Sequence, residues 1–185
     1  MAEKLNLHKL AFIGGGAMGE AIIKGITGAG LMDPAAIFVG AHRQERADYL
    51  HETYGVTGLV DNCEAVKDAD MVVLAIKPQI VDSVLRGALV SAVPAKAVIL
   101  SIMGSVTIEK IAGIFNGHPV IRTMPNTPLA VGAGMTAIAP GTGVSEEAVK
   151  TAEQIFGCCG ETLRIQERIL KRSRRSQAAG RDMYM

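Results

Sequence analysis

Short apolar runs alternate along the chain with longer stretches in which apolar residues recur at helical spacing. The apolar runs predict six strands, at Lys9–Ile13, Ile37–Ala41, Met71–Ile76, Ala97–Ser101, Pro119–Met124 and Gly134–Ala139. The periodic stretches predict five helices, at Ala17–Gly28, Glu45–Tyr54, Ile80–Ala88, Val106–Phe115 and Glu146–Phe156. This alternation indicates an α/β fold with a doubly wound, mostly parallel sheet and helices on both faces.

One segment combines a strand end, a glycine-rich turn and a helix start. The apolar run that ends at Ile13 is followed by Gly14-x-Gly16-x-x-Gly19, and helical spacing begins at once. This order is typical of Rossmann-like dinucleotide-binding domains. There the first glycine makes the tight turn, the second admits the pyrophosphate, and the third lets helix and strand pack closely. The helix N-terminus then binds the phosphates. An ordinary glycine-rich turn is the alternative.

Ligands of doubly wound sheets bind beyond the carboxyl ends of the strands, so the residues there are candidates for the site. The second predicted strand leads into His42 and Arg43, with Arg46 close behind, where NAD-binding sites place an acidic residue. Because arginine matches the geometry of a phosphate group, these residues favour NADPH over NADH. A solvated loop with ordinary surface charge is the alternative.

Two further strand ends carry candidate residues whose role the pattern leaves open. Lys77 stands beside Pro78, and is either a group at the edge of the cofactor or a solvent-facing lysine. Asn126 lies in a rigid turn between Pro125 and Pro128, and its amide either positions cofactor or substrate or serves the turn alone. No arrangement of nucleophile and base is recognisable, which fits a reaction whose chemistry belongs to a cofactor.

Composition and cysteine usage narrow the class of protein. The 185 residues are 49% hydrophobic and 20% charged, which suits one domain with a substantial core. We recognise neither a signal peptide nor an apolar run long enough to span a bilayer. Cys63, Cys158 and Cys159 are odd in number, so we expect free thiols in a reducing cytoplasm. No His and Cys cluster has metal-ligand spacing, so no metal is expected.

Four segments together resemble the pyrroline-5-carboxylate reductase family. They read FIGGGAMG (12–19), LAIKPQ (74–79), LSIMGSVT (100–107) and VIRTMPNTP (120–128), and the last is the most specific. The resemblance covers residues 8–167 and implies NAD(P)H-dependent reduction of 1-pyrroline-5-carboxylate to L-proline, the last step of proline biosynthesis. The alternatives are another reductase with a similar nucleotide domain, and a dinucleotide-binding module without catalysis.

The resemblance also implies which residues bind the cofactor. The pyrophosphate lies at Ile13, Gly14, Gly15, Gly16, Ala17, Met18 and Gly19. Asn62 matches a family position near the adenosine end. The nicotinamide side comprises Ala75, Ile76, Lys77, Pro78, Ile102, Met103 and Gly104. No catalytic nucleophile of the protein is implied, because the reaction is hydride transfer from the nicotinamide to the carbon of a protonated imine.

The resemblance stops after Glu167. Residues 1–167 carry 13 Lys and Arg against 17 Asp and Glu, whereas residues 168–185 carry six against one. We expect residues 1–167 to form the dinucleotide-binding domain and residues 168–185 to be an unfolded basic tail, produced by a frameshift rather than built to bind nucleic acid or membrane. Family members form homo-oligomers through a C-terminal domain. We expect that domain to be missing here and turnover to be impaired.

Overall fold

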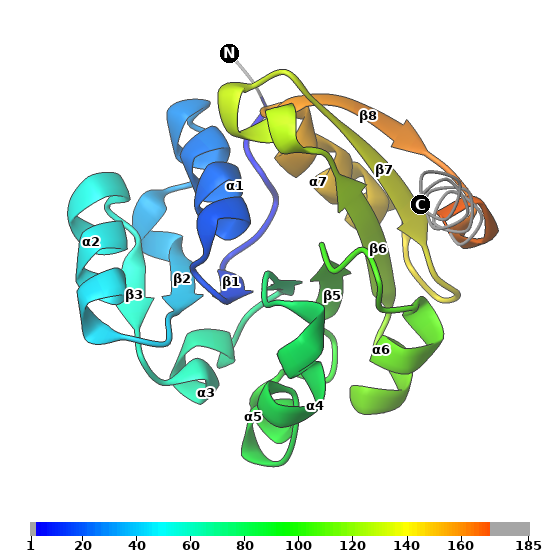
Figure 1. Cartoon of the computed structure of the whole chain (residues 1–185), viewed down its shortest axis with the longest axis horizontal. Coiled ribbons are helices and arrows are strands. Elements are labelled where there is room, and N and C mark those ends of the chain that lie inside the picture. Colours follow the sequence, from blue (N-terminus) through cyan, green and yellow to red (C-terminus); the bar gives the residue numbers. More distant parts are fainter. Residues whose placement is uncertain (1–2, 171–185) are drawn as a thin grey trace, which may run out of the picture.

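The computed structural model describes residues 3–170, which are built around one eight-stranded sheet (Figure 1). The strands are β1 (Leu10–Ile13), β2 (Ile37–Gly40), β3 (Thr57–Leu59), β4 (Met71–Leu74), β5 (Val98–Ser101), β6 (Val120–Pro125), β7 (Gly134–Pro140) and β8 (Gly160–Arg164). They lie in the order β3-β2-β1-β4-β5-β6-β7-β8. All neighbours are parallel except β6 and β7, which pair antiparallel. The predicted mostly parallel α/β sheet is therefore confirmed.

Helices cover both faces of the sheet. They are α1 (Ala17–Gly28), α2 (Gln44–Tyr54), α3 (Asn62–Val66), α4 (Val81–Val84), α5 (Ala88–Ala92), α6 (Ile108–Ile114) and α7 (Glu146–Gly157). Three 3₁₀ turns, η1 (Pro34–Ala36), η2 (Pro78–Ile80) and η3 (Thr127–Val131), complete the described part. Helices α1, α2 and α7 cover one face of the sheet, and α3, α4, α5 and α6 cover the other (Figure 1). The buried residues of the two sets of helices belong to two separate apolar clusters.

The alternation of side chains along a strand explains how one short run serves two cores. In β1, Leu10 and Phe12 belong to the cluster beneath α1 and α7, whereas Ala11 and Ile13 belong to the cluster beneath α3 to α6. All four residues of β1 and of β4 are buried. Strands covered on both faces are apolar throughout, which is why these two segments show no polar alternation.

Several predicted elements differ from the observed ones. The single helix expected over Ile80–Ala88 is wrong, because the segment divides into η2, α4 and α5. Gly87 has a φ of +56°, a conformation that interrupts a right-handed helix between α4 and α5. The strand expected over Met71–Ile76 ends at Leu74. The elements β3, α3 and β8 were not predicted, since they are short and have little apolar periodicity.

The described structure continues three residues past the predicted domain boundary at Glu167. Residues 167–170 form a helical turn, and Leu170 is buried. The rest of the predicted tail, residues 171–185, lies outside the described residues. The boundary and the unfolded tail therefore stay predictions.

Candidate functional site

The turn after β1 brings three strand ends together. Gly14 has a φ of +104°, and a Cβ there would lie 2.6 Å from the carbonyl oxygen of Ala75. The N–H of Gly14 donates to the Gly40 carbonyl at 2.9 Å, and the N–H of Ala75 donates to the Ile13 carbonyl at 2.9 Å. The carboxyl ends of β2, β1 and β4 thus adjoin at the point where the strand order reverses. Ligands of doubly wound sheets bind at this point.

The N-terminus of α1 opens onto the same point without a side-chain cap. Gly16 is the N-cap residue, has an extended backbone, and supplies no capping hydrogen bond. A Cβ on Gly16 would meet no atom within 4 Å, whereas a Cβ on Gly19 would lie 2.9 Å from the Gly14 carbonyl oxygen. The helix therefore packs closely on the turn at Gly19, while Gly16 and Ala17, where the helix begins, are exposed. The first N–H groups of a helix have no acceptor within it. This arrangement fits a phosphate group.

A half-buried acid in the first turn of α1 is neutralised by its neighbours. Glu20 forms an ion pair with Arg46, and its Oε1 accepts hydrogen bonds from Tyr49 at 3.0 Å and Tyr54 at 2.8 Å. Arg46 Nε also donates to the Gly15 carbonyl at 2.6 Å. Partial burial favours the neutral acid, but the hydrogen bonds from Arg46 and the two tyrosines outweigh it, so the pKa of Glu20 lies below its ordinary value. The helix end therefore stays favourable to an anion.

The pKa of Tyr54 is raised to about 12 by burial and by its hydrogen bond to Glu20. The phenol thus stays protonated and remains a donor at neutral pH.

The structure places the predicted adenosine-side residues at the end of β2. The side chains of His42 and Arg43 are exposed, and neither makes a hydrogen bond or ion pair with the rest of residues 3–170. Arg46, the third basic residue considered there, is instead engaged by Glu20. Asn62 begins α3, and its side-chain amide lies where a Cβ on Gly40 would stand. The end of β2 therefore carries two unengaged basic groups and one amide.

The predicted nicotinamide-side residues lie beyond β4 and β5. The N–H of Ile102 donates to the Leu74 carbonyl at 3.2 Å, which holds the segment after β5 beside the end of β4. Ala75, Ile76, Pro78, Ile102 and Gly104 are half-buried, and Lys77 is exposed. Met103 differs, because its side chain is part of the core beneath α3 to α6. Only its backbone remains to line a ligand.

Asn126 is exposed at the end of β6 and serves the turn. Its Oδ1 accepts a hydrogen bond from the N–H of Met135 at 2.9 Å, which ties the turn to the start of β7. The carbonyl of the side chain is therefore engaged within the protein. A positioning role for this residue stays a prediction.

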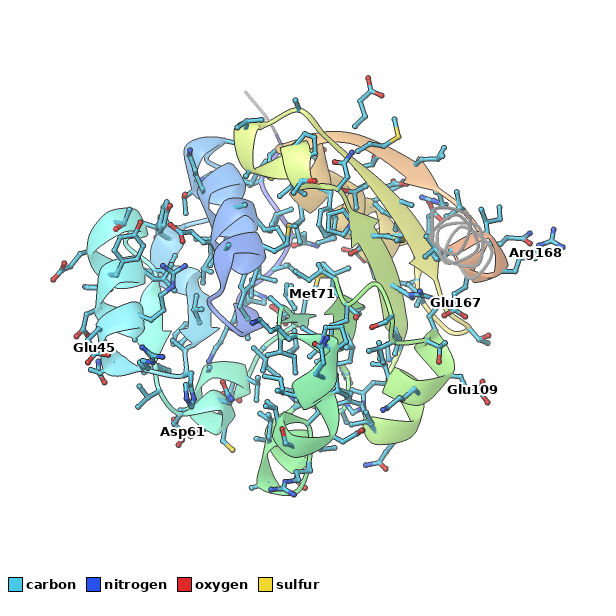
Figure 2. All side chains as sticks on the ribbon, viewed as in Figure 1. Glu45, Asp61, Met71, Glu109, Glu167 and Arg168 are labelled. Carbon is cyan, nitrogen blue, oxygen red and sulfur yellow. The ribbon has the colours of Figure 1, made fainter. Side chains whose placement is uncertain are left out.

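Sequence reasoning missed two charged residues beside the nicotinamide-side loop. Arg122, in the middle of β6, donates from Nη2 to the Gly104 carbonyl at 2.6 Å. Its Nη1 donates to Glu167 Oε1 at 2.9 Å (Glu167 is labelled in Figure 2). The signal in the sequence was an arginine within a strand that otherwise looked buried.

Cys63, Cys158 and Cys159 are free thiols. Within residues 3–170, no three His, Cys, Asp or Glu side chains gather as they would around a metal ion. None of the helices described is long and apolar enough to cross a membrane.

The strand order, the glycine turn and the uncapped helix define a dinucleotide-binding α/β domain. Residues 9–105 match the family model described as NADP oxidoreductase, coenzyme F420-dependent. The chain belongs to this family.

Among known proteins, the chain is similar to pyrroline-5-carboxylate reductases. It is 38% identical over 162 residues to the enzyme of Synechocystis, covering 88% of this chain and 60% of that protein. The solved reductase of Coxiella burnetii aligns with a TM-score of 0.82 and 31% identity, over 87% of this chain and 60% of that one. The Plasmodium falciparum enzyme, solved with NADP bound, aligns with a TM-score of 0.76 and 27% identity, over 89% and 59%. The chain thus spans about 60% of the length of these relatives.

The contacts of Glu20 with Arg46, Tyr49 and Tyr54 predict that substituting Glu20 lowers the stability of the fold by an amount that depends on pH. Because the folded-state pKa of Glu20 is depressed, its contribution is present above the ordinary pKa of 4.5 and disappears as the pH falls through the folded-state value. We expect Glu20→Gln to lower the free energy of unfolding by about 1 kcal/mol at pH 7. Urea denaturation at pH 7 and at successively lower pH measures the difference.

Glu45→Gln is the matched control, because Glu45 is an exposed acid in the first turn of α2 (Figure 2). Its effect on the free energy of unfolding at pH 7 should be smaller than that of Glu20→Gln, because the Glu45 side chain is exposed. A Glu20→Gln deficit that persists undiminished in acid would contradict the assigned ionisation.

Proposed function

We propose that this chain binds NADPH across the carboxyl ends of β2, β1, β4 and β5. The observation that carries the proposal is the uncapped N-terminus of α1, which opens beside Gly16 onto the point where the strand order reverses. The family match to NADP oxidoreductases supports it. So does the similar structure of the P. falciparum enzyme, which has NADP bound.

The strand ends divide the proposed site into two halves. Residues 13–19 hold the pyrophosphate on the helix N-terminus, and Asn62 lies near the adenosine. His42 and Arg43 take the 2′-phosphate, since both are exposed and unengaged in the described structure. Residues 75–78 and 102–104 line the nicotinamide half. All of these residues lie within residues 1–167, which we propose as the bounds of the domain.

We propose further that the domain serves the reduction of 1-pyrroline-5-carboxylate to L-proline. A bound NADPH supplies the hydride from nicotinamide C4 to the carbon of the protonated imine. The chain contributes orientation and the exclusion of water, through the half-buried apolar residues Ile76 and Ile102 beside the nicotinamide half. The names of the similar proteins, pyrroline-5-carboxylate reductases, support this substrate.

The second candidate function is dinucleotide binding without turnover. The similarity reaches about 60% of the relatives' length, so whatever the remainder of those proteins contributes to imine binding or subunit association lies outside the aligned part. We expect this chain by itself to bind NADPH and to turn over slowly. A cytoplasmic location, and the absence of nucleic-acid and membrane partners, remain predictions.

Gly16 provides the first test, because the space beside it is open. Gly16→Ala should change the free energy of unfolding by no more than about 1 kcal/mol. It should weaken NADPH binding by about tenfold or more, since the methyl group occupies the space where the pyrophosphate approaches. Titration of NADPH fluorescence measures the dissociation constant.

Gly28→Ala, at the other end of α1, is the matched control, because a Cβ there also meets nothing within 4 Å. It should bind NADPH like the unaltered chain. Equal affinities of the Gly16 and Gly28 variants would sink the proposed pyrophosphate site.

The predicted preference for NADPH is tested at Arg43. Arg43→Gln should weaken NADPH binding by about fivefold and leave NADH binding unchanged, because only NADPH carries the 2′-phosphate. Added salt should reduce the difference in NADPH affinity between the Arg43→Gln variant and the unaltered chain, because salt screens the attraction between charges. Lys96→Gln removes an exposed positive charge from the segment that precedes β5, at the opposite end of the sheet, and should alter neither affinity. A parallel loss of NADH binding would refute the assignment.

A chimera tests the substrate. Residues 1–167 of this chain are joined to the remaining portion of the Synechocystis relative, and NADPH consumption with 1-pyrroline-5-carboxylate is followed. We expect the chimera to turn over at a rate approaching that of the relative, and the unaltered chain to bind NADPH with little consumption. If the chimera folds and binds NADPH yet leaves the imine unreduced while the relative reduces it, the reductase assignment is wrong.

A further inference from the structure

Arg122 and Glu167 join three segments around the loop after β5. The Arg122 side chain is only 2% exposed. It donates to the Gly104 carbonyl at 2.6 Å and to Glu167 Oε1 at 2.9 Å. The same carboxylate oxygen accepts the N–H of Ile108, the first residue of α6, at 2.8 Å. The loop after β5, the start of α6 and the segment after β8 are thus fixed to one guanidinium.

Burying the Arg122 guanidinium costs free energy, so its contacts must contribute something specific to the structure. Removing a guanidinium from water is unfavourable even when it is paired, and Arg122 Nε has no hydrogen-bond partner among the described residues. The space where a Cβ on Gly104 would stand is open, because its nearest neighbour there would be the Met124 Cε at 3.9 Å. The planar guanidinium sets the direction of both of its partners. Arg122 therefore fixes the direction of the Gly104 carbonyl.

The pyrophosphate turn is built in the same way. There Arg46 is paired with Glu20 and donates to the Gly15 carbonyl at 2.6 Å. In both loops an arginine held by a glutamate donates to a glycine carbonyl at the carboxyl edge of the sheet. The repetition at two ends of one proposed site indicates that both arginines orient ligand-binding backbone.

We propose that Arg122 is a positioning residue for the nicotinamide half of the cofactor, acting through the loop 102–104. This proposal rests on the proposed function, which places NADPH across the strand ends. The loop follows β5, whereas the adenosine half lies at the ends of β1, β2 and β3. Loosening the loop should therefore weaken contacts to the nicotinamide half and leave contacts to the adenosine half intact.

Two ligands distinguish this role from a purely structural one. NADPH spans both halves, whereas 2′,5′-ADP contains only the adenosine and its phosphates. Arg122→Met should weaken NADPH binding by about tenfold and leave 2′,5′-ADP binding within about twofold of the unaltered chain. Calorimetric titration of each purified full-length variant gives both dissociation constants, at a temperature where circular dichroism shows it folded.

Two further variants keep the test decisive. Arg122→Lys retains the buried charge but replaces the planar fork with a single ammonium, so a smaller loss confined to NADPH is expected. If Arg122→Met does not fold, the two dissociation constants of Arg122→Lys test the positioning role instead. Arg164→Gln is the matched control, because Arg164 forms ion pairs with Glu146 and Glu153 on the surface, away from the loop. It should leave both ligands unchanged.

Each outcome has a distinct meaning. If the unaltered chain binds neither ligand, the proposed function falls, and this inference falls with it. If the unaltered chain binds both and the folded Arg122 variants match it, or lose both ligands equally, the positioning role alone is overturned. A loss restricted to NADPH supports it.

Discussion

The close approach of the first turn to β4 is the constraint on which the proposed site depends. At Gly14 the backbone takes a left-handed conformation in contact with the Ala75 carbonyl, and at Gly19 the helix lies directly on the turn. Side chains at these positions would separate β1, α1 and β4. Without them, the helix begins immediately after the strand, and its free N–H groups lie at the edge of the sheet where the strand order reverses. Electrostatic attraction for a pyrophosphate follows from this geometry.

The charge of Glu20 is offset by its neighbours, and arginine hydrogen bonds tie the loops at this edge of the sheet. An acid in the first turn of α1 stabilises the helix dipole but would repel a phosphate; the Arg46 and tyrosine contacts to Glu20 offset its charge. The exposed His42 and Arg43 are the groups that we propose to contact the 2′-phosphate on the adenosine side. Each of the two loops is tied by an arginine through a glycine carbonyl, at Gly15 and at Gly104. We therefore expect NADPH binding to require little reordering of the backbone in these two loops.

The features predicted correctly from the sequence are those fixed by local rules. The bounds of α1 match the prediction because a glycine turn and helical spacing define its start. The strands β1 and β4 were found because burial on both faces makes them apolar throughout. Short elements such as β3 and β8 lie at the two edges of the sheet, where their residues are half-buried or exposed and show no apolar period. The partnership of Arg122 with Glu167 spans 45 residues, and no local pattern reveals it.

We propose above all that the N-terminus of α1 holds the pyrophosphate of NADP. An NMR titration that resolves each backbone amide, with NADP⁺ added to the full chain, tests this most directly. We expect the largest shifts on the amides of Gly15, Gly16, Ala17 and Met18, with further shifts near Arg43 and Gly104. Saturable binding that leaves the amides of residues 14–19 unmoved, with the largest shifts on another face of the sheet, would contradict it.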